Sequence, residues 1–199
     1  VALKANIQLD DIYYEGIEKV ALQDTLYLDE LGYRVRLIAK ASRVGEKLCV
    51  AVYPTAIDTE HPLAMVRNEF NAIFSTGNMV GESMVYGKGA GSLPTGSAVM
   101  SDILDIAFDI HAHQSRRNLE TNLTQSDVMS IDEQYTEFYY RIMLKDQVGT
   151  LEEVSRLFND YEINIAKIIQ KETVNDSAEV VVVTGKVQEK KNNLLQKGL

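Results

Sequence analysis

Residues Lys145 to Leu151, with the sequence KDQVGTL, join a predicted strand to a predicted helix and set the architecture of the C-terminal region. The run Glu137 to Leu144 has the composition of a strand, and the pattern from Gly149 to Asn159 predicts a helix. Because the first amides of a helix lack partners within it and carry partial positive charge, such a corner can bind the carboxylate of a free amino acid. The candidate ligands are Asp146 and the backbone amides of Gly149, Thr150 and Leu151. The alternative is that Asp146 only caps the helix.

Two further strands and a second helix follow this corner. Strands are predicted over Ile163–Glu172 and Ala178–Thr184, with a turn at Val174–Ser177, and a helix is predicted to start near Lys186. The order strand, helix, strand, strand, helix is that of a ferredoxin-like unit that lacks its last strand.

The preceding part of the chain predicts helices and two strand pairs. The predicted helices are Ala21–Glu30 and Pro94–His111, with a short helical turn at His61–Ala64. The predicted strand pairs are Arg34–Ser42 with Lys47–Tyr53, which Pro54 is expected to end, and Phe70–Thr76 with Met79–Tyr86, which turns at Gly77–Asn78. Helical spacing in Pro94–His111 predicts a buried face made of Val99, Ile103, Ile106, Ala107 and Ile110.

A segment rich in Ser, Thr, Asn and Gln separates the two regions. We predict a domain over residues 1–113, a linker over 114–136 with one helical turn at Ser126–Ile131, and an incomplete domain over 137–199. The predicted fold class is α+β: a mixed-sheet domain with flanking helices, followed by a ferredoxin-like domain without its last strand.

Composition excludes several classes of protein. The 199 residues, 45% of them apolar, can bury a core, and a formal net charge of -9 argues against a nucleic-acid partner. The lone cysteine, Cys49, excludes an internal disulfide and fits a reducing cytosol. Since no apolar run approaches the roughly 20 residues of a membrane helix, we expect a cytoplasmic protein with no membrane partner. The chain opens without Met, and Val1 to Asn6 have the pattern of the end of a helix, so we expect a fragment of a longer protein.

The segment Gly87–Thr95, GKGAGSLPT, links a predicted strand to a predicted helix. Glycines let backbone amides approach a phosphate or a nicotinamide closely. The spacing G-x-G-x-G is neither the dinucleotide fingerprint nor a phosphate-binding loop, so the residues alone leave open a ligand contact or a tight turn. His61, His111 and His113 lack the spacing of metal ligands, and no metal site is predicted.

Three segments occur in an order and at separations that carry a resemblance. They are Asp10–Ile17 (DDIYYEGI), His61–Ala64 (HPLA) and Gly87–Thr95, the last being the most specific. Together they resemble the C-terminal half of the substrate domain of homoserine dehydrogenase. The stretch from Glu137 onward resembles an ACT domain, the regulatory module of many amino-acid-metabolism enzymes.

The resemblance implies an enzyme whose N-terminal Rossmann domain binds NAD(P) and whose substrate domain dimerises and holds homoserine or aspartate semialdehyde. The catalytic lysine of the family and its acidic partners would fall before Val1, so no catalytic residue is expected in this chain, and Lys4 lies one helical turn beyond the family's position. The cofactor contact carries over to Gly89, Ala90 and Gly91, although Lys88 stands where the family often has proline. We expect NAD(P) in the complete enzyme and no cofactor on this fragment alone.

The resemblance also extends the effector site. In ACT-like modules the second strand faces the loop after the first strand across a dimer interface, which adds Asn164 to the candidates. Threonine is the family's usual inhibitor. The alternative is that Asn164 only caps an edge strand.

Two functions follow from these patterns. The first is part of an NAD(P)-dependent homoserine dehydrogenase, which interconverts L-homoserine and L-aspartate 4-semialdehyde in threonine and methionine biosynthesis under amino-acid feedback; the fragment alone would be inactive. The alternative is a non-catalytic amino-acid sensor that acts on a partner. Both imply a homodimer, because pairing across a two-fold axis covers the edges of small sheets.

Overall fold

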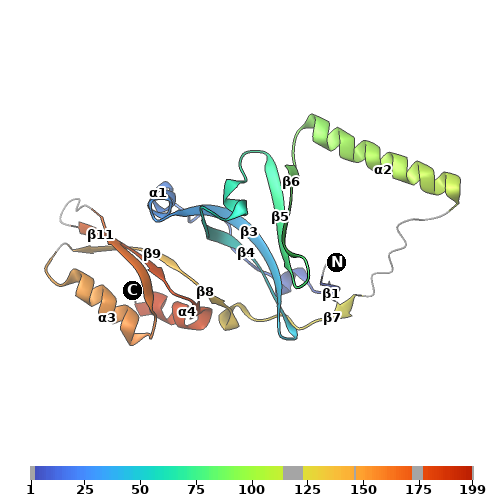
Figure 1. The fold of residues 1–199 in the computed structure, drawn as a ribbon. Coiled ribbons are helices and arrows are strands. Elements are labelled where there is room, and N and C mark those ends of the chain that lie inside the picture. Colours follow the sequence, from blue (N-terminus) through green and yellow to red (C-terminus); the bar gives the residue numbers. More distant parts are fainter. Residues whose placement is uncertain (1–2, 114–122, 146, 172–176, 199) are drawn as a thin grey trace. The chain divides into compact units, whose positions relative to one another are not determined.

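The computed structural model describes residues 3–113, 123–145, 147–171 and 177–198 (Figure 1). Contacts divide the chain into two units that alternate along the sequence. The first unit comprises residues 28–36 and 55–123, and the second comprises residues 2–27, 37–54 and 124–199. Both units combine helices with small sheets, so the predicted α+β class is confirmed.

The C-terminal part of the second unit is an antiparallel sheet with two helices. Its strands are β9 (Tyr139–Lys145), β10 (Ile165–Gln170) and β11 (Ser177–Thr184), in the order β10-β11-β9. The helix α3 (Thr150–Asp160) connects β9 to β10, and α4 (Glu189–Gly198) follows β11. The predicted order of elements is present, but α4 starts at Glu189, because β12 (Val187–Gln188) first pairs with β8 (Tyr135–Thr136). Of the predicted turn Val174–Ser177, residues 174–176 lie outside the described residues.

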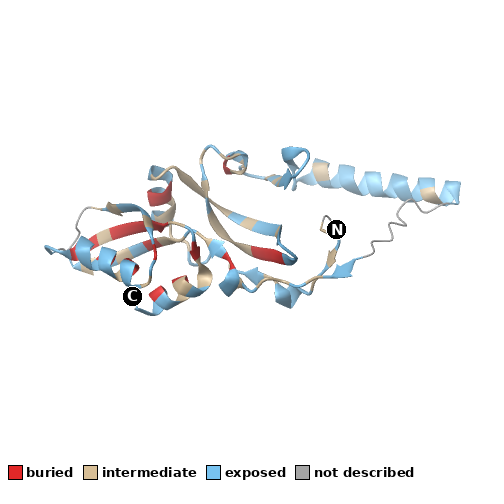
Figure 2. Ribbon diagram, turned by 60° about the horizontal axis from the view of Figure 1, so that its bottom comes forward, coloured by how far each residue is buried: buried red, intermediate tan, exposed pale blue. Residues whose placement is uncertain are grey.

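This sheet is buried on both faces. On one face, side chains from the two helices pack against Tyr140, Val180 and Val182; the helix residues are Val154, Phe158 and Leu195. Val181 and Val183 alternate onto the opposite face and are also buried. The four consecutive valines of β11 are thus typical of a strand covered on both sides, and Figure 2 shows buried residues along the sheet.

A second sheet contains β2 (Tyr13–Tyr14), β3 (Tyr33–Val44) and β4 (Lys47–Asp58), in the order β2-β4-β3. The prediction that Pro54 ends the second strand is wrong, since β4 continues to Asp58. Glu15 N donates to Val52 O at 2.7 Å, so the backbone N and O of Val52 face the side of β4 on which β2 lies. Because backbone groups alternate in direction along a strand, those of Pro54, two residues later, face the same side. β2 stops at Tyr14, and a proline that faces an open edge costs no ladder hydrogen bond.

The first unit contains the predicted hairpin and the predicted helical turn. β5 (Phe70–Gly77) pairs with β6 (Gly81–Lys88), and the reversal occupies residues 78–80 rather than Gly77–Asn78. Gly81 pairs with Gly77 and has a φ of 76°, a conformation that glycine adopts without strain. The turn η2 (Pro62–Met65) confirms the prediction at His61–Ala64, with His61 Nδ1 accepting a hydrogen bond from Leu63 N at 3.2 Å.

The long helix α2 (Ser92–Ala112) is present, but its predicted buried face is wrong for this chain. Val99, Ile103, Ile106 and Ile110 are 51% to 70% exposed, and Ala107 is also exposed. Figure 2 shows the helix in pale blue along most of its length. Periodicity identifies the apolar side of a helix but not whether the same chain supplies its cover. No helix in the described part of the chain combines the length and apolar character needed to cross a membrane.

Of the expected helix end at Val1 to Asn6, residues 1–2 lie outside the described residues, and Ala5 and Asn6 form a strand instead. β1 (Ala5–Asn6) pairs in parallel with β7 (Thr124–Gln125), and Lys4 O accepts a hydrogen bond from Thr124 N at 3.0 Å. This pairing holds Ala5 and Asn6 extended, and Lys4 turns into them with a φ of 50°.

Part of the predicted linker is structured. Residues 114–122 lie outside the described residues, whereas β7, the turn η3 (Ile131–Glu133) and β8 all fall within 123–136. The helical turn predicted at Ser126–Ile131 is wrong, because Val128 pairs with Leu48 of β4 and the turn begins only at Ile131.

Candidate functional site

The glycine segment runs between β6 and α2 and is exposed at Gly89, Ala90 and Gly91. Gly89 and Gly91 each have a local structural reason, whereas Gly87 has open space where a Cβ would be. A Cβ at Gly89 would lie 1.5 Å from Asn71 Nδ2, and Gly91, the residue before α2, has a φ of 118°. The start of α2 carries no side-chain cap, so its first-turn amides are not used by a capping side chain.

Lys88 has local partners that explain a lysine at this position. Its Nζ lies 3.0 Å from Glu69 Oε1 and 5.5 Å from the centroid of the Phe70 ring. Phe70 in turn stacks on Tyr86, with ring centroids 4.8 Å apart. Lys88, which directly precedes Gly89, is therefore held by an ion pair with Glu69 and by its contact with the stacked ring of Phe70.

The KDQVGTL corner joins β9 to α3, and Asp146 lies outside the described residues. Gly149 precedes α3 with a φ of 96° and has open space where a Cβ would be. Thr150 is buried, and its hydroxyl lies 2.8 Å from Lys145 O and 2.9 Å from Gln147 O. Thr150 N donates to Gln147 O at 3.3 Å, so the expected free amide at Thr150 is wrong. The proposed ligand contacts of the Gly149 amide and of the amide of the half-exposed Leu151 stay predictions.

Asn164 lies at the other end of the sheet from this corner. β11 pairs Thr184 with Ile165 at one end and Ser177 with Lys145 at the other. Since a strand rises about 3.3 Å per residue, the two segments are about 20 Å apart along the sheet. Asn164 O accepts a hydrogen bond from Gly185 N at 2.8 Å, which fixes the start of β10. Within one chain the structure does not bring Asn164 to the corner, so a shared site requires a second copy.

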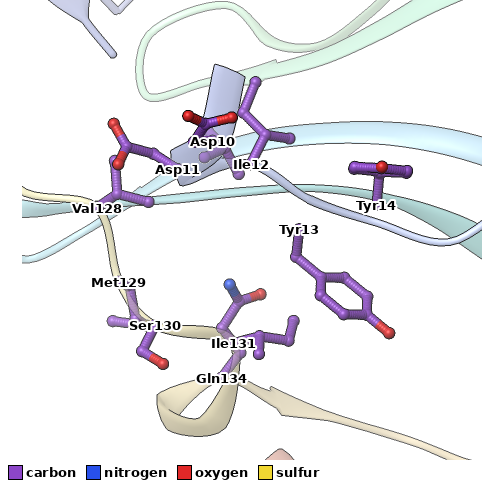
Figure 3. A pocket seen from close by; sticks show the side chains of 11 residues that line it. Asp10, Asp11, Ile12, Tyr13, Tyr14, Val128, Met129, Ser130, Ile131 and Gln134 are labelled. Carbon is purple, nitrogen blue, oxygen red and sulfur yellow. The ribbon is translucent and has the colours of Figure 1, made fainter. Parts of the chain in front are cut away.

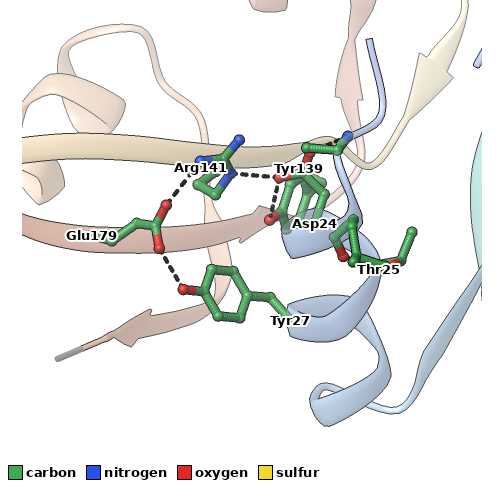
Figure 4. Close-up of polar contacts among 8 residues, drawn as sticks. Asp24, Thr25, Tyr27, Tyr139, Arg141 and Glu179 are labelled. Atoms are coloured by element: carbon green, nitrogen blue, oxygen red, sulfur yellow. Dashed lines mark hydrogen bonds and ion pairs between the residues drawn. The ribbon is translucent and has the colours of Figure 1, made fainter. Parts of the chain in front are cut away.

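A polar cluster that the sequence did not predict lies on the sheet face opposite α3 and α4. We name it the Arg141 cluster; its members are Asp24, Tyr27, Tyr139, Arg141 and Glu179 (Figure 4). Arg141 donates through Nε to Asp24 Oδ1 at 2.6 Å and through Nη1 to Glu179 Oε1 at 2.8 Å. Tyr139 donates to Asp24 Oδ1 at 3.0 Å, and Tyr27 donates to Glu179 Oε2. Two residues of α1 (Leu22–Glu30) are thereby tied to β9 and β11.

The electrostatics of the Arg141 cluster favour its ionised form. Burial alone would raise the pKa of Asp24, but hydrogen bonds from Arg141, the Ala21 amide and Tyr139 outweigh burial and hold that pKa below its usual range. Hydrogen bonds from Tyr27 and then Arg141 lower the pKa of Glu179. Burial, followed by the charge of Asp24, raises the pKa of Tyr139, so its hydroxyl stays protonated as a donor. The cluster is a half-buried set of donors matched to two carboxylates.

The sequence carries only an indirect signal for this cluster. Arg141 and Glu179 are charged residues within largely apolar strands. By strand alternation both lie on the same sheet face as Val181, opposite the face that carries Tyr140. Nothing local in Asp24 or Tyr27 points to a partner more than 100 residues away. Among the described residues, no group of His, Cys, Asp and Glu side chains could hold a metal ion.

Comparisons with known proteins agree with this fold and these segments. The family model described as homoserine dehydrogenase matches residues 1–104, the part that contains the DDIYYEGI, HPLA and glycine segments. That match covers just over half of the chain and shows that it belongs to the homoserine dehydrogenase family.

Individual relatives extend the similarity to the C-terminal region. The chain is 34% identical over 181 residues to homoserine dehydrogenase of Bacillus subtilis, which covers 90% of this chain and 42% of the relative. It is 36% identical over 184 residues to that of Neisseria gonorrhoeae, covering 89% of this chain and 42% of the relative.

Solved structures give the same picture. A homoserine dehydrogenase from Thiobacillus denitrificans superposes with a TM-score of 0.82 at 28% identity, covering 96% of this chain and 44% of that one. The S. aureus enzyme superposes with a TM-score of 0.65 at 30% identity, covering 98% and 47%. The chain therefore spans less than half the length of the relatives it matches.

Proposed function

We propose that the chain is the substrate-domain and regulatory portion of a cytoplasmic, NAD(P)-dependent homoserine dehydrogenase. The complete enzyme interconverts L-homoserine and L-aspartate 4-semialdehyde, on the route to threonine and methionine. The observation that carries the proposal is the match of the family over residues 1–104 together with relatives that cover about nine tenths of the chain.

The residues at the start of α2 fit a contact with the cofactor, though not a complete site. The space beside Gly89 is taken by Asn71 and a Cβ at Gly91 would lie 3.4 Å from Pro94 Cδ, so the proposed contact is with the uncapped first turn of α2. Amides at a helix start favour an oxygen of the ligand, and Gly91 adopts its φ of 118° without strain where other residues would not. When bound, NAD(P) supplies or accepts the hydride. This segment's part is to orient the cofactor, and the proton donor lies outside this chain.

An activity assay tests whether the proton donor lies outside this chain. The 199-residue chain and a form extended toward its N-terminus are mixed with NADPH and aspartate semialdehyde, and oxidation of NADPH is followed. We expect turnover only in the extended form, because the resemblance places the family's catalytic lysine and its acidic partners before Val1. Turnover by the short chain would refute the proposal that the proton donor lies outside it.

We further propose that residues 137–199 are an ACT domain that binds an amino-acid effector, with threonine the first candidate. The strand order β10-β11-β9 with both helices on one face supports this, as does the helix start at Gly149. Because Asn164 and the corner lie at opposite ends of one sheet, the effector site forms between two copies of the chain. A homodimer is therefore part of the proposal.

Titration calorimetry with L-threonine tests the effector site, and light scattering tests the dimer. We expect saturable binding that Asn164→Ala weakens at least about five-fold, as expected for loss of a hydrogen bond to a charged group. Asn159→Ala, an equal truncation at the exposed end of α3, is the control and should bind normally. A monomer at micromolar concentration, or unchanged binding in Asn164→Ala, would contradict the shared site.

A further inference from the structure

A cavity of about 520 Å³ lies in the second unit, and its lining includes no residue of the glycine segment or the KDQVGTL corner. It opens beside β4, where two short segments pair with the same edge of that strand. Asp127 O and Met129 N bond to Leu48 at one end, and Glu15 N bonds to Val52 at the other. Val50 lies between these two pairings in the strand alternation and lines the cavity. The volume is within the range of small-molecule sites.

Gln134 supplies a buried donor at this cavity. The residue is 7% exposed and lines the cavity, and its Oε1 accepts a hydrogen bond from the Cys49 thiol at 2.8 Å. Its Nε2 is buried and has no acceptor among the described residues. Figure 3 shows the amide pointing from its own backbone toward the segment 10–14. A buried donor of this kind is costly unless an acceptor reaches it, so the amide indicates a place for a ligand oxygen.

The charges around the cavity restrict the rest of the ligand. Asp10 and Asp11 are acidic members of the lining, and none of the lining residues is basic. Asp11 Oδ2 already accepts from Gln8 N at 2.9 Å, and the exposed Asp10 is the other carboxylate of the lining. Apolar side chains from Ile12, Val50, Val128, Met129 and Ile131 form part of the remaining walls, together with Tyr13, Tyr14 and Ser130. Carboxylates without a cation disfavour an anion and favour an ammonium group.

We propose that the Gln134 cavity binds a small primary amine that also carries a hydrogen-bond-accepting oxygen and a short hydrocarbon part. Gln134 Nε2 donates to the oxygen, Asp10 pairs with the ammonium group, and the apolar walls cover the hydrocarbon. The site differs from the proposed effector site, which selects a carboxylate at a helix start.

Three probes that share an isobutyl group separate these contributions. L-leucinamide has the ammonium group, the oxygen and the hydrocarbon; isoamylamine lacks the oxygen; and N-acetyl-L-leucine lacks the ammonium group and is an anion. Amide resonances of the ¹⁵N-labelled 199-residue chain are followed during titration. We expect saturable shifts in residues 10–14 and 128–134 with L-leucinamide, binding weaker by about three- to ten-fold with isoamylamine, and no saturable shift there with N-acetyl-L-leucine.

Variants then assign the contacts. Gln134→Glu keeps an oxygen for Cys49 but replaces the donor by an acceptor, and Gln134→Met removes the amide at similar size; both should weaken L-leucinamide binding. Asp10→Asn should do the same, whereas Asp160→Asn, an equal charge change on α3, should not. Equal affinity for the three probes, shifts outside 10–14 and 128–134, or unaltered binding in the Gln134 variants would overturn the proposal. L-leucinamide has no carboxylate, so its result is independent of the threonine titration.

Discussion

Replacing Arg141 by methionine removes the cation that lies between Asp24 and Glu179, and we expect it to destabilise the chain more than replacing either carboxylate. In Asp24→Asn, Arg141 keeps its 2.8 Å contact with Glu179. In Arg141→Met, two carboxylates remain on one sheet face without their shared partner, and like charges at short range repel. The expected order of stability loss is therefore Arg141→Met above Asp24→Asn.

The magnitude follows from burial. The Arg141 and Asp24 side chains are 31% and 13% exposed and 2.6 Å apart, whereas Lys47 and Glu133 are 45% and 47% exposed at 3.0 Å. A hydrogen bond to a charged group contributes about 1.5–3 kcal/mol, and an exposed ion pair about 0.2–1 kcal/mol. We expect a coupling free energy of about 1.5–2.5 kcal/mol for Asp24 with Arg141, because partial exposure lowers the upper limit.

The assay is a double-mutant cycle by urea unfolding, followed by circular dichroism, on Asp24→Asn, Arg141→Met and the double variant. The pair Lys47 and Glu133 provides the matched control cycle, with an expected coupling below about 1 kcal/mol. Coupling below about 0.5 kcal/mol for Asp24 with Arg141, or equal coupling in both cycles, would show that the Arg141 cluster does not hold α1 to the sheet.

Three other predictions concern the same unit. Phe158→Ala should cost about 3–5 kcal/mol in urea unfolding, because Phe158 is 0% exposed and packs edge-on against Tyr140; Phe158→Leu should cost distinctly less, and equal losses would argue against a packing cause. Burial raises the pKa of Glu189, so its charged form is disfavoured in the fold; Glu189→Gln should raise Tm at pH 7 but not at pH 4, and a lower Tm at pH 7 would contradict this. Asp24 and Glu179 have lowered pKa values, so their contribution to the free energy of unfolding is complete above about pH 5 and declines as pH falls below about 4. Between pH 5 and pH 3 the parent chain should therefore lose unfolding free energy more steeply than Asp24→Asn. Parallel pH profiles of the two proteins would refute this.

Local patterns predicted the elements because their causes are local. His61 accepts from Leu63 N in the turn predicted from His-Pro, and the apolar run Val180–Val183 became the central strand of a three-stranded sheet. Errors arose where a partner distant in sequence altered the outcome. Pro54 continues a strand because β2 ends before reaching it, and residues near Lys4 are extended because Thr124 pairs with them. Neither partner can be inferred from neighbouring residues.

The candidate sites show the same division. The glycine at position 149 and the helix after it were predictable, because a positive φ and an amphipathic period leave marks in the sequence. The internal hydrogen bond of Thr150 N was not, because it depends on how the chain turns at Gln147.

By itself the sequence determined the order of the longer strands and helices, the family and the position of the glycine segment, since each depends on residue type and short-range spacing. Only the tertiary structure decided that Asp24 and Tyr27 meet Arg141 and Glu179, and that Asn164 lies a sheet's length from Gly149. It also decided that the buried side-chain amide of Gln134 lies at the cavity. The Arg141 cluster in particular depends on strand register, because a shift of one residue would move Arg141 and Glu179 to the other face of the sheet.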